Sequence, residues 1–118
     1  MSTERIFREN INGIKCVYKG ILHSYNDKPA KIDKYGTKTW YKEGIYHREN
    51  GPALVKSEFE VWYLNGKMHR ANGPAYTNKL GTQEWYIHGK RHREDGPAVI
   101  KANGDKEWWL NGERQPDP

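Results

Sequence analysis

The chain repeats one short pattern several times. The pattern reads Trp-Tyr-x-x-Gly-x-x-His-Arg-x-x-Gly-Pro-Ala and begins at Trp40, Trp62 and Trp85, with a truncated copy at Trp108. Successive copies start 22, 23 and 23 residues apart. A fixed period of this length indicates a repeat array, in which each unit buries its apolar face only against its neighbours. A residue that recurs in every unit is therefore expected to serve packing rather than a single catalytic centre.

The array covers nearly the whole chain and forms one domain. Before the three complete units, residues 17–23 and Pro29-Ala30 keep the Tyr-Gly-His-Pro-Ala skeleton of a degenerate unit, with Ser24 where later units have Arg. Terminal units of an array are atypical because each has only one neighbour to cover it. We expect a half-unit at 1–16, units at about 17–39, 40–61, 62–84 and 85–107, and a terminal half-unit at 108–118.

The composition favours a thin structure with an aromatic core. Hydrophobic residues make up 35% of the 118-residue chain and the mean hydropathy is −1.10, which is low for a thick packed core. Fifteen aromatic residues (five Trp, eight Tyr and two Phe) offset this shortage, because each large ring buries more area than an aliphatic side chain. We expect ladders of aromatic rings rather than a globule or a disordered chain.

Charge, cysteine content and the first residues bear on partners and compartment. The formal net charge is +5, and Lys and Arg are spread through every unit, so an acidic partner is favoured only weakly. Cys16 is the only cysteine, which excludes an intrachain disulfide and suits a reducing compartment. The N-terminal residues lack the apolar run of a signal peptide, and no stretch is long enough to span a bilayer. We expect a cytoplasmic protein without membrane insertion.

Each unit is predicted to form two β-strands joined by tight turns. Asn65-Gly66 lies between β-forming residues, and this dipeptide is the strongest short signal for a hairpin, because a type I′ turn needs positive φ at both positions. A second turn is expected after each Pro-Ala segment, at Gly36, Gly81 and Asn103-Gly104, and the 22-residue unit has its deletion there, at Ser57-Glu58. The sequence predicts an all-β fold, an elongated antiparallel meander of ~23-residue β-hairpin repeats in a single-layer twisted sheet.

The hairpin register predicts which side chains share a face of the sheet. A two-residue turn places Tyr63 opposite Met68 and Trp62 opposite His69. Neighbouring residues on a strand point to opposite faces, so Trp and His share one face, and Tyr, the third position and Arg share the other. Stacked units would form a Trp ladder (Trp40, Trp62, Trp85, Trp108) beside a His ladder (His47, His69, His92), and a Tyr ladder (Tyr41, Tyr63, Tyr86, with Trp109) beside an Arg ladder (Arg48, Arg70, Arg93).

The unit resembles MORN repeats. Tyr63, Gly66 and His69 lie at the spacing of that family's aromatic residue, turn glycine and histidine, and the period matches. The likeness covers roughly residues 17–112 and is closest to the divergent variant of bacterial and viral proteins, including the antitoxin of a toxin–antitoxin pair. Arg-x-x-Gly-Pro-Ala departs from the usual Gly-x-Gly. The resemblance implies a β-hairpin array used for protein contact, scaffolding or occasionally membrane association, and it supplies no catalytic residues.

The His ladder has two interpretations. Three imidazoles at one-unit spacing could bind a metal ion or act as a base with a neighbouring acid. Consecutive units in a meander lie two strands apart, about 9–10 Å, which is too far for one Zn²⁺ to bridge at ~2 Å per bond. The structural interpretation, in which each His packs on its cross-strand Trp and bonds a turn carbonyl, is the one we favour.

The Arg ladder also has two interpretations. Cations beside aromatic faces, with Arg91 and Lys67 nearby, could follow a phosphate backbone or hold a nucleotide while the rings stack on bases. The structural interpretation is that each Arg covers its neighbouring Tyr and pairs with Glu49, Glu94 or Asp95. Acids follow the Arg in two of the three units and reduce the positive field, which favours the structural interpretation.

No pattern indicates catalysis. The sequence shows no Gly-rich phosphate loop, no Ser-centred elbow, no Cys-His pair and no clustered carboxylates. We therefore predict no catalytic residues, no metal site and no cofactor.

The function expected from these features is binding of a macromolecule. We predict a non-catalytic protein-binding module, an antagonist or inhibitor of the antitoxin type or the phage-encoded anti-defence type, which blocks a host enzyme or complex in the host cytoplasm. The alternative is a binder of nucleic acid or of a nucleotide second messenger through the Arg–Tyr face, and a homodimer remains open. The predicted partner-binding residues are Tyr41, Arg48, Tyr63, Met68, Arg70, Tyr86, Arg91 and Arg93.

Overall fold

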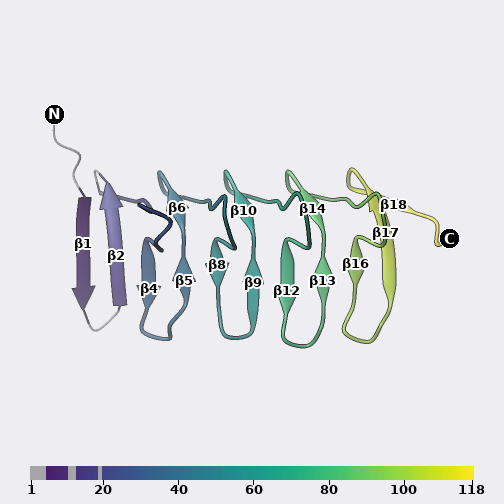
Figure 1. Cartoon of the computed structure of the whole chain (residues 1–118), viewed down its shortest axis with the longest axis horizontal. Coiled ribbons are helices and arrows are strands. Elements are labelled where there is room, and N and C mark those ends of the chain that lie inside the picture. Colours follow the sequence, from purple (N-terminus) through teal and green to yellow (C-terminus); the bar gives the residue numbers. More distant parts are fainter. Residues whose placement is uncertain (1–4, 11–12, 19) are drawn as a thin grey trace.

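The computed structural model describes residues 5–10, 13–18 and 20–118 as a succession of short β-strands (Figure 1). The molecule measures 56 × 30 × 17 Å along its principal axes, so it is long and thin. This arrangement confirms the predicted all-β fold, an elongated and open antiparallel meander. Within the described ranges, no helix is long and apolar enough to cross a membrane.

One long antiparallel sheet runs along the molecule. Its strand order is β1-β2-β4-β5-β8-β9-β12-β13-β16-β17-β18, with β3 paired to β2, so strands close in sequence are also neighbours in space. The strands are β1 (Arg5–Asn10), β2 (Gly13–Tyr18), β3 (Ile21–Leu22), β4 (Lys31–Asp33), β5 (Lys38–Thr39), β8 (Leu54–Val55), β9 (Phe59–Val61), β12 (Tyr76–Asn78), β13 (Gln83–Glu84), β16 (Val99–Ile100), β17 (Lys106–Leu110) and β18 (Glu113–Gln115).

Each complete unit also forms a short two-stranded hairpin that is separate from this sheet. The hairpins are β6 (Tyr41–Lys42) with β7 (Ile45–Tyr46), β10 (Tyr63–Leu64) with β11 (Lys67–Met68), and β14 (Tyr86–Ile87) with β15 (Lys90–Arg91). Neighbouring hairpins are joined by backbone hydrogen bonds, as where Gly66 donates its N–H to the Tyr46 carbonyl over 2.8 Å. Each complete unit therefore has four short strands in place of the two that the sequence predicted. The strand pairing is interrupted at the Trp that begins the unit and at the His-Arg-x-x-Gly-Pro loop.

Both kinds of predicted turn are confirmed. Asn65 and Gly66 have φ of 50° and 79°, as a type I′ turn requires, and Tyr63 lies opposite Met68. At the other end of the unit, Gly81 donates its N–H to Asn78 over 3.2 Å. The shorter turn of the 22-residue unit lies between Lys56 and Phe59, whose backbone groups bond over 2.9 Å.

The buried residues include the recurring alanines together with Trp40, Val61 and Val99, whereas Trp62, Trp85 and Trp108 are half-buried. The four alanines of the Pro-Ala segments have no exposed surface; they are Ala30, Ala53, Ala75 and Ala98. Each full unit closes on itself where the Trp donates its backbone N–H to the Ala carbonyl, as between Trp62 and Ala75 at 2.7 Å. A larger side chain at these alanines would clash, because the interior is already close-packed. Trp40 is only 5% exposed, and its indole N–H donates to the Asp27 carbonyl over 3.0 Å.

Candidate functional site

A histidine from each unit holds the hairpin turn of the following unit. Nδ1 of His47 accepts a hydrogen bond from the backbone N–H of Asn65 over 2.9 Å. The same bond joins His23 to Glu43 (3.1 Å), His69 to His88 (2.9 Å) and His92 to Asn111 (2.9 Å). In each of these bonds Nδ1 is the acceptor, so the imidazole takes the place of a backbone carbonyl in satisfying the N–H of the turn. The prediction that each His bonds a turn carbonyl was wrong, because the ring accepts a hydrogen bond from a turn N–H.

The second ring nitrogen of the histidines has varied surroundings. Nε2 lies 3.6 Å from Glu49 in His47 and 3.5 Å from Glu94 in His92. The ring of His69 instead lies 4.4 Å from that of His88, and burial, followed by the nearby charge of His88, lowers the pKa of His69. Among the residues that the structure describes, no three His, Cys, Asp or Glu side chains gather as metal ligands would.

The repeated arginines stack on the tryptophans of their own units. The guanidinium carbon lies 3.9 Å from the ring centre in Arg48–Trp40, 4.1 Å in Arg70–Trp62 and 4.0 Å in Arg93–Trp85. The prediction that these arginines lie beside the tyrosines was therefore wrong. The alternation of side chains along a strand does not apply to these arginines, because Arg70 follows the end of β11 and lies in a loop.

The rest of the repeated motif holds this guanidinium in place. Nη1 of Arg70 donates to the Pro74 carbonyl over 3.2 Å, and the corresponding bonds are 3.1 Å in Arg48–Pro52 and 3.0 Å in Arg93–Pro97. A Cβ atom on Gly73 would lie 2.8 Å from Cζ of Arg70, so the glycine lets the backbone cover the guanidinium. The Gly-Pro-Ala segment thus clamps the arginine against the indole.

The three stacked arginines differ in their acidic partners. Arg48 makes a two-bond contact with Asp27 of the preceding loop, through Nε at 2.8 Å and Nη2 at 3.2 Å, and this contact lowers the pKa of Asp27. Nε of Arg93 donates to Asp95 of its own loop over 3.0 Å. Arg93–Asp95 is one of the pairs that the structural interpretation predicted. Nε of Arg70 is buried and has no hydrogen-bond partner within the described part of the chain.

The short hairpins carry a second row of side chains along the molecule, which we call the tyrosine row. Its members come from facing positions of the hairpins: Tyr41, Tyr46, Tyr63, Met68, Tyr86, Arg91 and Trp109. Ring centres are 5.1 Å apart in Tyr41–Tyr46 and 4.9 Å apart in Tyr46–Tyr63. Arg91 continues the row, with its guanidinium carbon 5.1 Å from the Trp109 ring centre. The row thus makes contacts across two unit boundaries, at Tyr46–Tyr63 and at Arg91–Trp109.

The phenol groups in the tyrosine row are partly desolvated. Burial raises the pKa of Tyr41 to about 12, with a further contribution from Tyr46. The pKa of Tyr86 is raised by burial and by Glu84, whose carboxylate accepts a hydrogen bond from the Tyr86 hydroxyl over 2.8 Å. Glu84 also pairs with Arg91 over 3.3 Å, so the cation in the row is partly neutralised.

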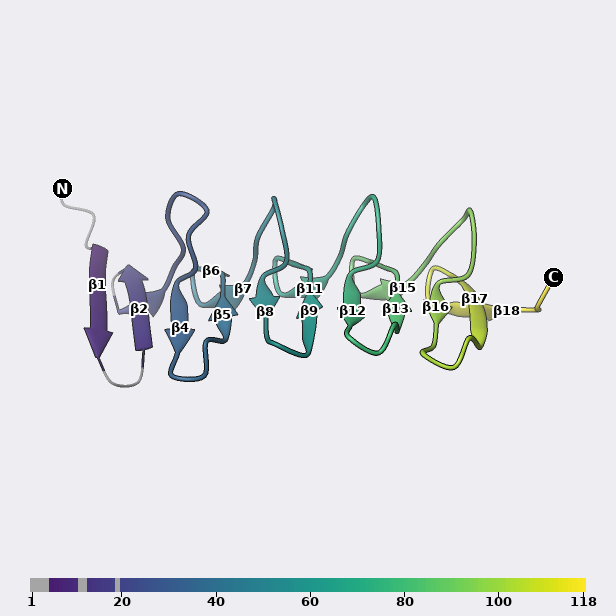
Figure 2. The same cartoon turned by 60° about the horizontal axis from the view of Figure 1, so that its bottom comes forward.

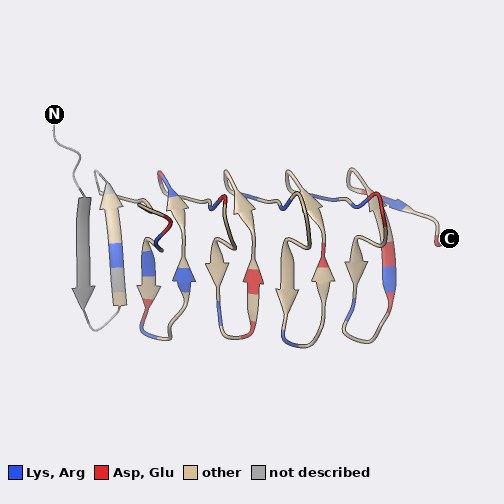
Figure 3. Ribbon diagram, viewed as in Figure 1, with Lys and Arg blue, Asp and Glu red and all other residues tan. Residues whose placement is uncertain are grey.

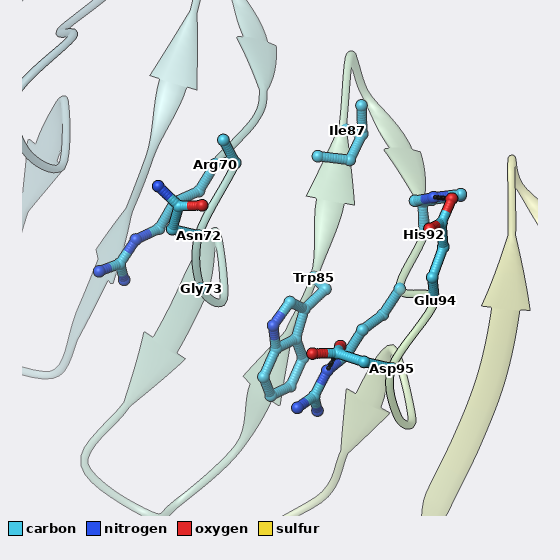
Figure 4. Close-up of a pocket in the computed structure, with 10 residues that line it drawn as sticks. Arg70, Asn72, Gly73, Trp85, Ile87, His92, Glu94 and Asp95 are labelled. Atoms are coloured by element: carbon cyan, nitrogen blue, oxygen red, sulfur yellow. Dashed lines mark hydrogen bonds and ion pairs between the residues drawn. The ribbon is translucent and has the colours of Figure 1, made fainter.

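Grooves lie between the loops that carry successive stacked arginines. These loops project from one side of the array (Figure 2). One groove, of about 830 Å³, lies between residues 70–73 and 92–95. In Figure 4, Trp85 and Asp95 flank its lower part while Arg70 and Asn72 lie across from them. Grooves of about 540 Å³ and 290 Å³ are lined by Trp62 and by Trp40, and one of about 470 Å³ lies beside Trp108 and Trp109.

The predicted partner-binding residues fall into two separate groups. The tyrosine row brings together Tyr41, Tyr63, Met68, Tyr86 and Arg91. The remaining three, Arg48, Arg70 and Arg93, line the grooves over the tryptophans. The sequence indicated no role for Asp27, which pairs with Arg48, because Asp27 lies in the loop of the degenerate unit at a position outside the repeated motif.

Charge does not divide the array into a basic and an acidic half. Lys and Arg appear along the whole array with Asp and Glu among them (Figure 3). Comparison with protein-family models, with curated proteins and with solved structures finds no match for this chain. The tyrosine row and the grooves are therefore the features of this molecule that indicate a function.

Proposed function

We propose that this chain is a non-catalytic protein-binding module built from MORN-like repeats. It acts as an antagonist, of the antitoxin type or the phage-encoded anti-defence type, and blocks a host enzyme or complex. The observation that carries the proposal is the tyrosine row, in which half-buried rings follow one another across unit boundaries. Aromatic side chains and arginine are the residues that contribute most to protein interfaces.

The tyrosine row combines a constant scaffold with a variable position. Every complete unit has a Tyr at the first of the two facing positions, whereas the residue opposite it changes from Tyr46 to Met68 to Arg91. Variation at one position of a repeat can determine which partner binds while the fold is preserved. A thin structure with aromatic residues on both sides also cannot cover both by itself, which supports a partner on one of them.

The contacts of the recurring polar residues support a binding role over a catalytic one. Each His of the ladder uses Nδ1 to hold the next turn, and each stacked Arg is clamped between an indole and a glycine. A general base needs a free nitrogen near a substrate proton, and a repeated structural bond occupies the nitrogen that would serve.

The geometry favours a protein over a nucleic acid as the partner. A nucleic-acid surface of this kind would alternate cations with exposed rings along one face. Arg48, Arg70 and Arg93 lie on the tryptophans instead, and the one arginine in the row, Arg91, pairs with Glu84. Nucleic acid or a nucleotide is accordingly kept as an outcome of the test.

The test is recovery of the partner with a tagged full-length chain, from lysate of the host cell with and without nuclease. The proposal expects one protein to be retained after nuclease treatment by the native chain. It also expects that protein to be lost when Tyr63→Ser, Tyr86→Ser and Arg91→Ser are combined. Recovery of nucleic acid or nucleotide in place of protein would contradict the proposal.

A matched control uses exposed side chains away from the tyrosine row. Tyr35 and Leu80 are 81% and 79% exposed at the turns of the long sheet, so Tyr35→Ser with Leu80→Ser removes apolar surface elsewhere. This control should retain the partner as well as the native chain does. Equal loss in the control and in the row variant would show that general stickiness, rather than the row, explains the capture.

A further inference from the structure

Arg70 differs from its two repeat equivalents in how its guanidinium is satisfied. All three arginines stack on a Trp and donate through Nη1 to a proline carbonyl. In Arg48 and Arg93, Nε also donates to an Asp of this chain. In Arg70, Nε is buried without a hydrogen-bond partner among the described residues.

The sequence explains why this donor is left over. Asp27 approaches Arg48 from the preceding loop, and the preceding loop of Arg70 has Asn50 on its groove wall. Asp95 approaches Arg93 from two residues later in its own loop, and the same position after Arg70 is Asn72. Arg70 therefore has Asn50 and Asn72 at the two positions from which an aspartate reaches Arg48 or Arg93.

The clamp fixes the direction in which the free edge of Arg70 points. The Trp62 ring lies on one side of the guanidinium at 4.1 Å, and Gly73 closes against it. Nη1 is held by the Pro74 carbonyl at 3.2 Å. The edge formed by Nε and Nη2, which in Arg48 binds both oxygens of Asp27, is the edge without a carboxylate in Arg70.

We infer that the groove around Arg70 accepts an aspartate or glutamate side chain of the protein partner. This Arg70 groove has a volume of about 540 Å³, and its lining includes Glu49, Asn50, Trp62, Arg70 and Asn72. The inference rests on the proposed function, since the carboxylate comes from a bound protein. The partner's carboxylate completes at Arg70 the pairing that Asp27 and Asp95 provide in the neighbouring units.

A carboxylate fits this groove better than a phosphate. The chain itself satisfies two equivalent arginines with carboxylates, so the space beside the guanidinium suits that group. A bidentate pair of Arg with a carboxylate is also geometrically specific. Glu49 lines the same groove, and its negative charge repels a phosphate dianion more strongly than a single carboxylate.

The first experiment measures, by NMR of the full-length chain, the Nε–H signals of the three stacked arginines, Arg48, Arg70 and Arg93. The probe is the peptide acetyl-Gly-Asp-Gly-amide, with acetyl-Gly-Asn-Gly-amide as the matched control. The inference expects the Arg70 signal to shift and saturate with the Asp peptide only, while Arg48 and Arg93 hardly move. In the variants Asn72→Asp and Asn50→Asp, a carboxylate of the chain occupies the edge, and the Arg70 shift should fall roughly tenfold or more.

Two results of this titration would overturn the inference. Equal shifts at Arg48, Arg70 and Arg93, or no shift at any of them, would show that the free edge of Arg70 confers no selectivity. A third arm uses inorganic phosphate. If phosphate saturates the Arg70 shift at a lower concentration than the Asp peptide, the groove selects a phosphorylated ligand and the carboxylate assignment is wrong.

A second experiment separates this inference from the proposed function. Peptides are selected from a displayed random library on the native chain and on Asn72→Asp. Peptides that bind the native chain through an essential Asp or Glu, and bind Asn72→Asp roughly tenfold more weakly or worse, support the inference. Selected peptides whose acidic residues are dispensable would overturn the inference and leave the protein-binding proposal intact. If the Asp peptide shifts Arg70 yet the library yields no binder, the carboxylate site stands and the protein-binding proposal is the one contradicted.

Discussion

Asn65 donates its backbone N–H to Nδ1 of His47 over 2.9 Å, although the two residues are 18 positions apart in the chain. The bond joins one unit to the turn of the next, and it recurs at every unit boundary from His23 to Asn111. In a repeat array, stability is the sum of the units and of the interfaces between neighbours. The histidines therefore contribute to the interfaces between neighbouring units.

Removal of one of these bonds should destabilise the chain. His47→Ala leaves the N–H of Asn65 without its acceptor, and loss of one hydrogen bond at an exposed site costs about 0.5–1.5 kcal/mol. The free energy of unfolding from urea titration measures this loss. Tyr35→Ala, at a residue that is 81% exposed, is the matched control and should leave the value unchanged. An equal free energy of unfolding for His47→Ala and the native protein would show that His47 does not stabilise the interface between units.

Two turns contain residues that tolerate positive φ less well than asparagine does. Glu43 and His88 have φ of 49° and 48°, in the position that Asn65 and Asn111 occupy in other units. Left-handed backbone costs an ordinary residue roughly 1–2 kcal/mol, and Asn is among the residues that adopt it most readily. Glu43→Asn and His88→Asn should each raise the melting temperature. A lower melting temperature in both variants would show that their side-chain contacts outweigh the backbone cost.

Stability should fall in mild acid because of His69. Burial, followed by the charge of His88, lowers the pKa of His69 below its usual value. The unfolded chain therefore binds this proton more readily than the folded chain, so stability is full above the ordinary pKa of about 6.5 and is lost as the pH falls through it. Protonation of Nδ1 also removes the acceptor for the N–H of His88.

The measurement for this effect is urea unfolding between pH 7.5 and pH 5.5 in steps. The variant His69→Gln serves as the reference because position 69 no longer titrates. The native chain should lose more stability than His69→Gln over this range. A native stability that rises as the pH falls would have the opposite sign and would exclude the proposed linkage.

The indole–guanidinium stack should contribute to the fold as a pair. Trp62 is half-buried, so Trp62→Ala is expected to cost ~3 kcal/mol, at the lower end of the range for removal of a large ring, and a small domain has little more than that to lose. Arg70→Ala should cost less, and a double-mutant cycle should give a coupling of about 0.5–2 kcal/mol. A soluble Trp62→Ala variant with an unchanged melting temperature would contradict the assignment of the Trp residues to the core.

The local parts of the fold could be predicted from the sequence because short-range chemistry determines them. Asn65-Gly66 specifies its turn by the sign of φ, and the turn fixes Tyr63 opposite Met68. These features depend only on residues within one unit.

The positions of the arginines could not be predicted in the same way. Alternation along a strand assigns a face only while the strand continues, and Arg70 lies beyond β11. Its direction is set by the Pro74 carbonyl and by the space over Gly73, which are loop contacts. The pairing of Arg48 with Asp27 crosses a unit boundary into the degenerate unit, and Asp27 lies at a position outside the repeated motif.

The central claim, that the tyrosine row binds a protein, is tested most directly by the dissociation constant of the recovered partner. The constant is measured for the native chain, for Tyr63→Ser with Tyr86→Ser and Arg91→Ser, and for Tyr35→Ser with Leu80→Ser, after circular dichroism confirms that all three fold alike. We predict about a hundredfold weaker binding for the row variant and native affinity for the turn variant. Native affinity in the row variant, with binding lost instead on changing Glu43, His88 or Lys90, would place the interface at the turns and contradict the claim.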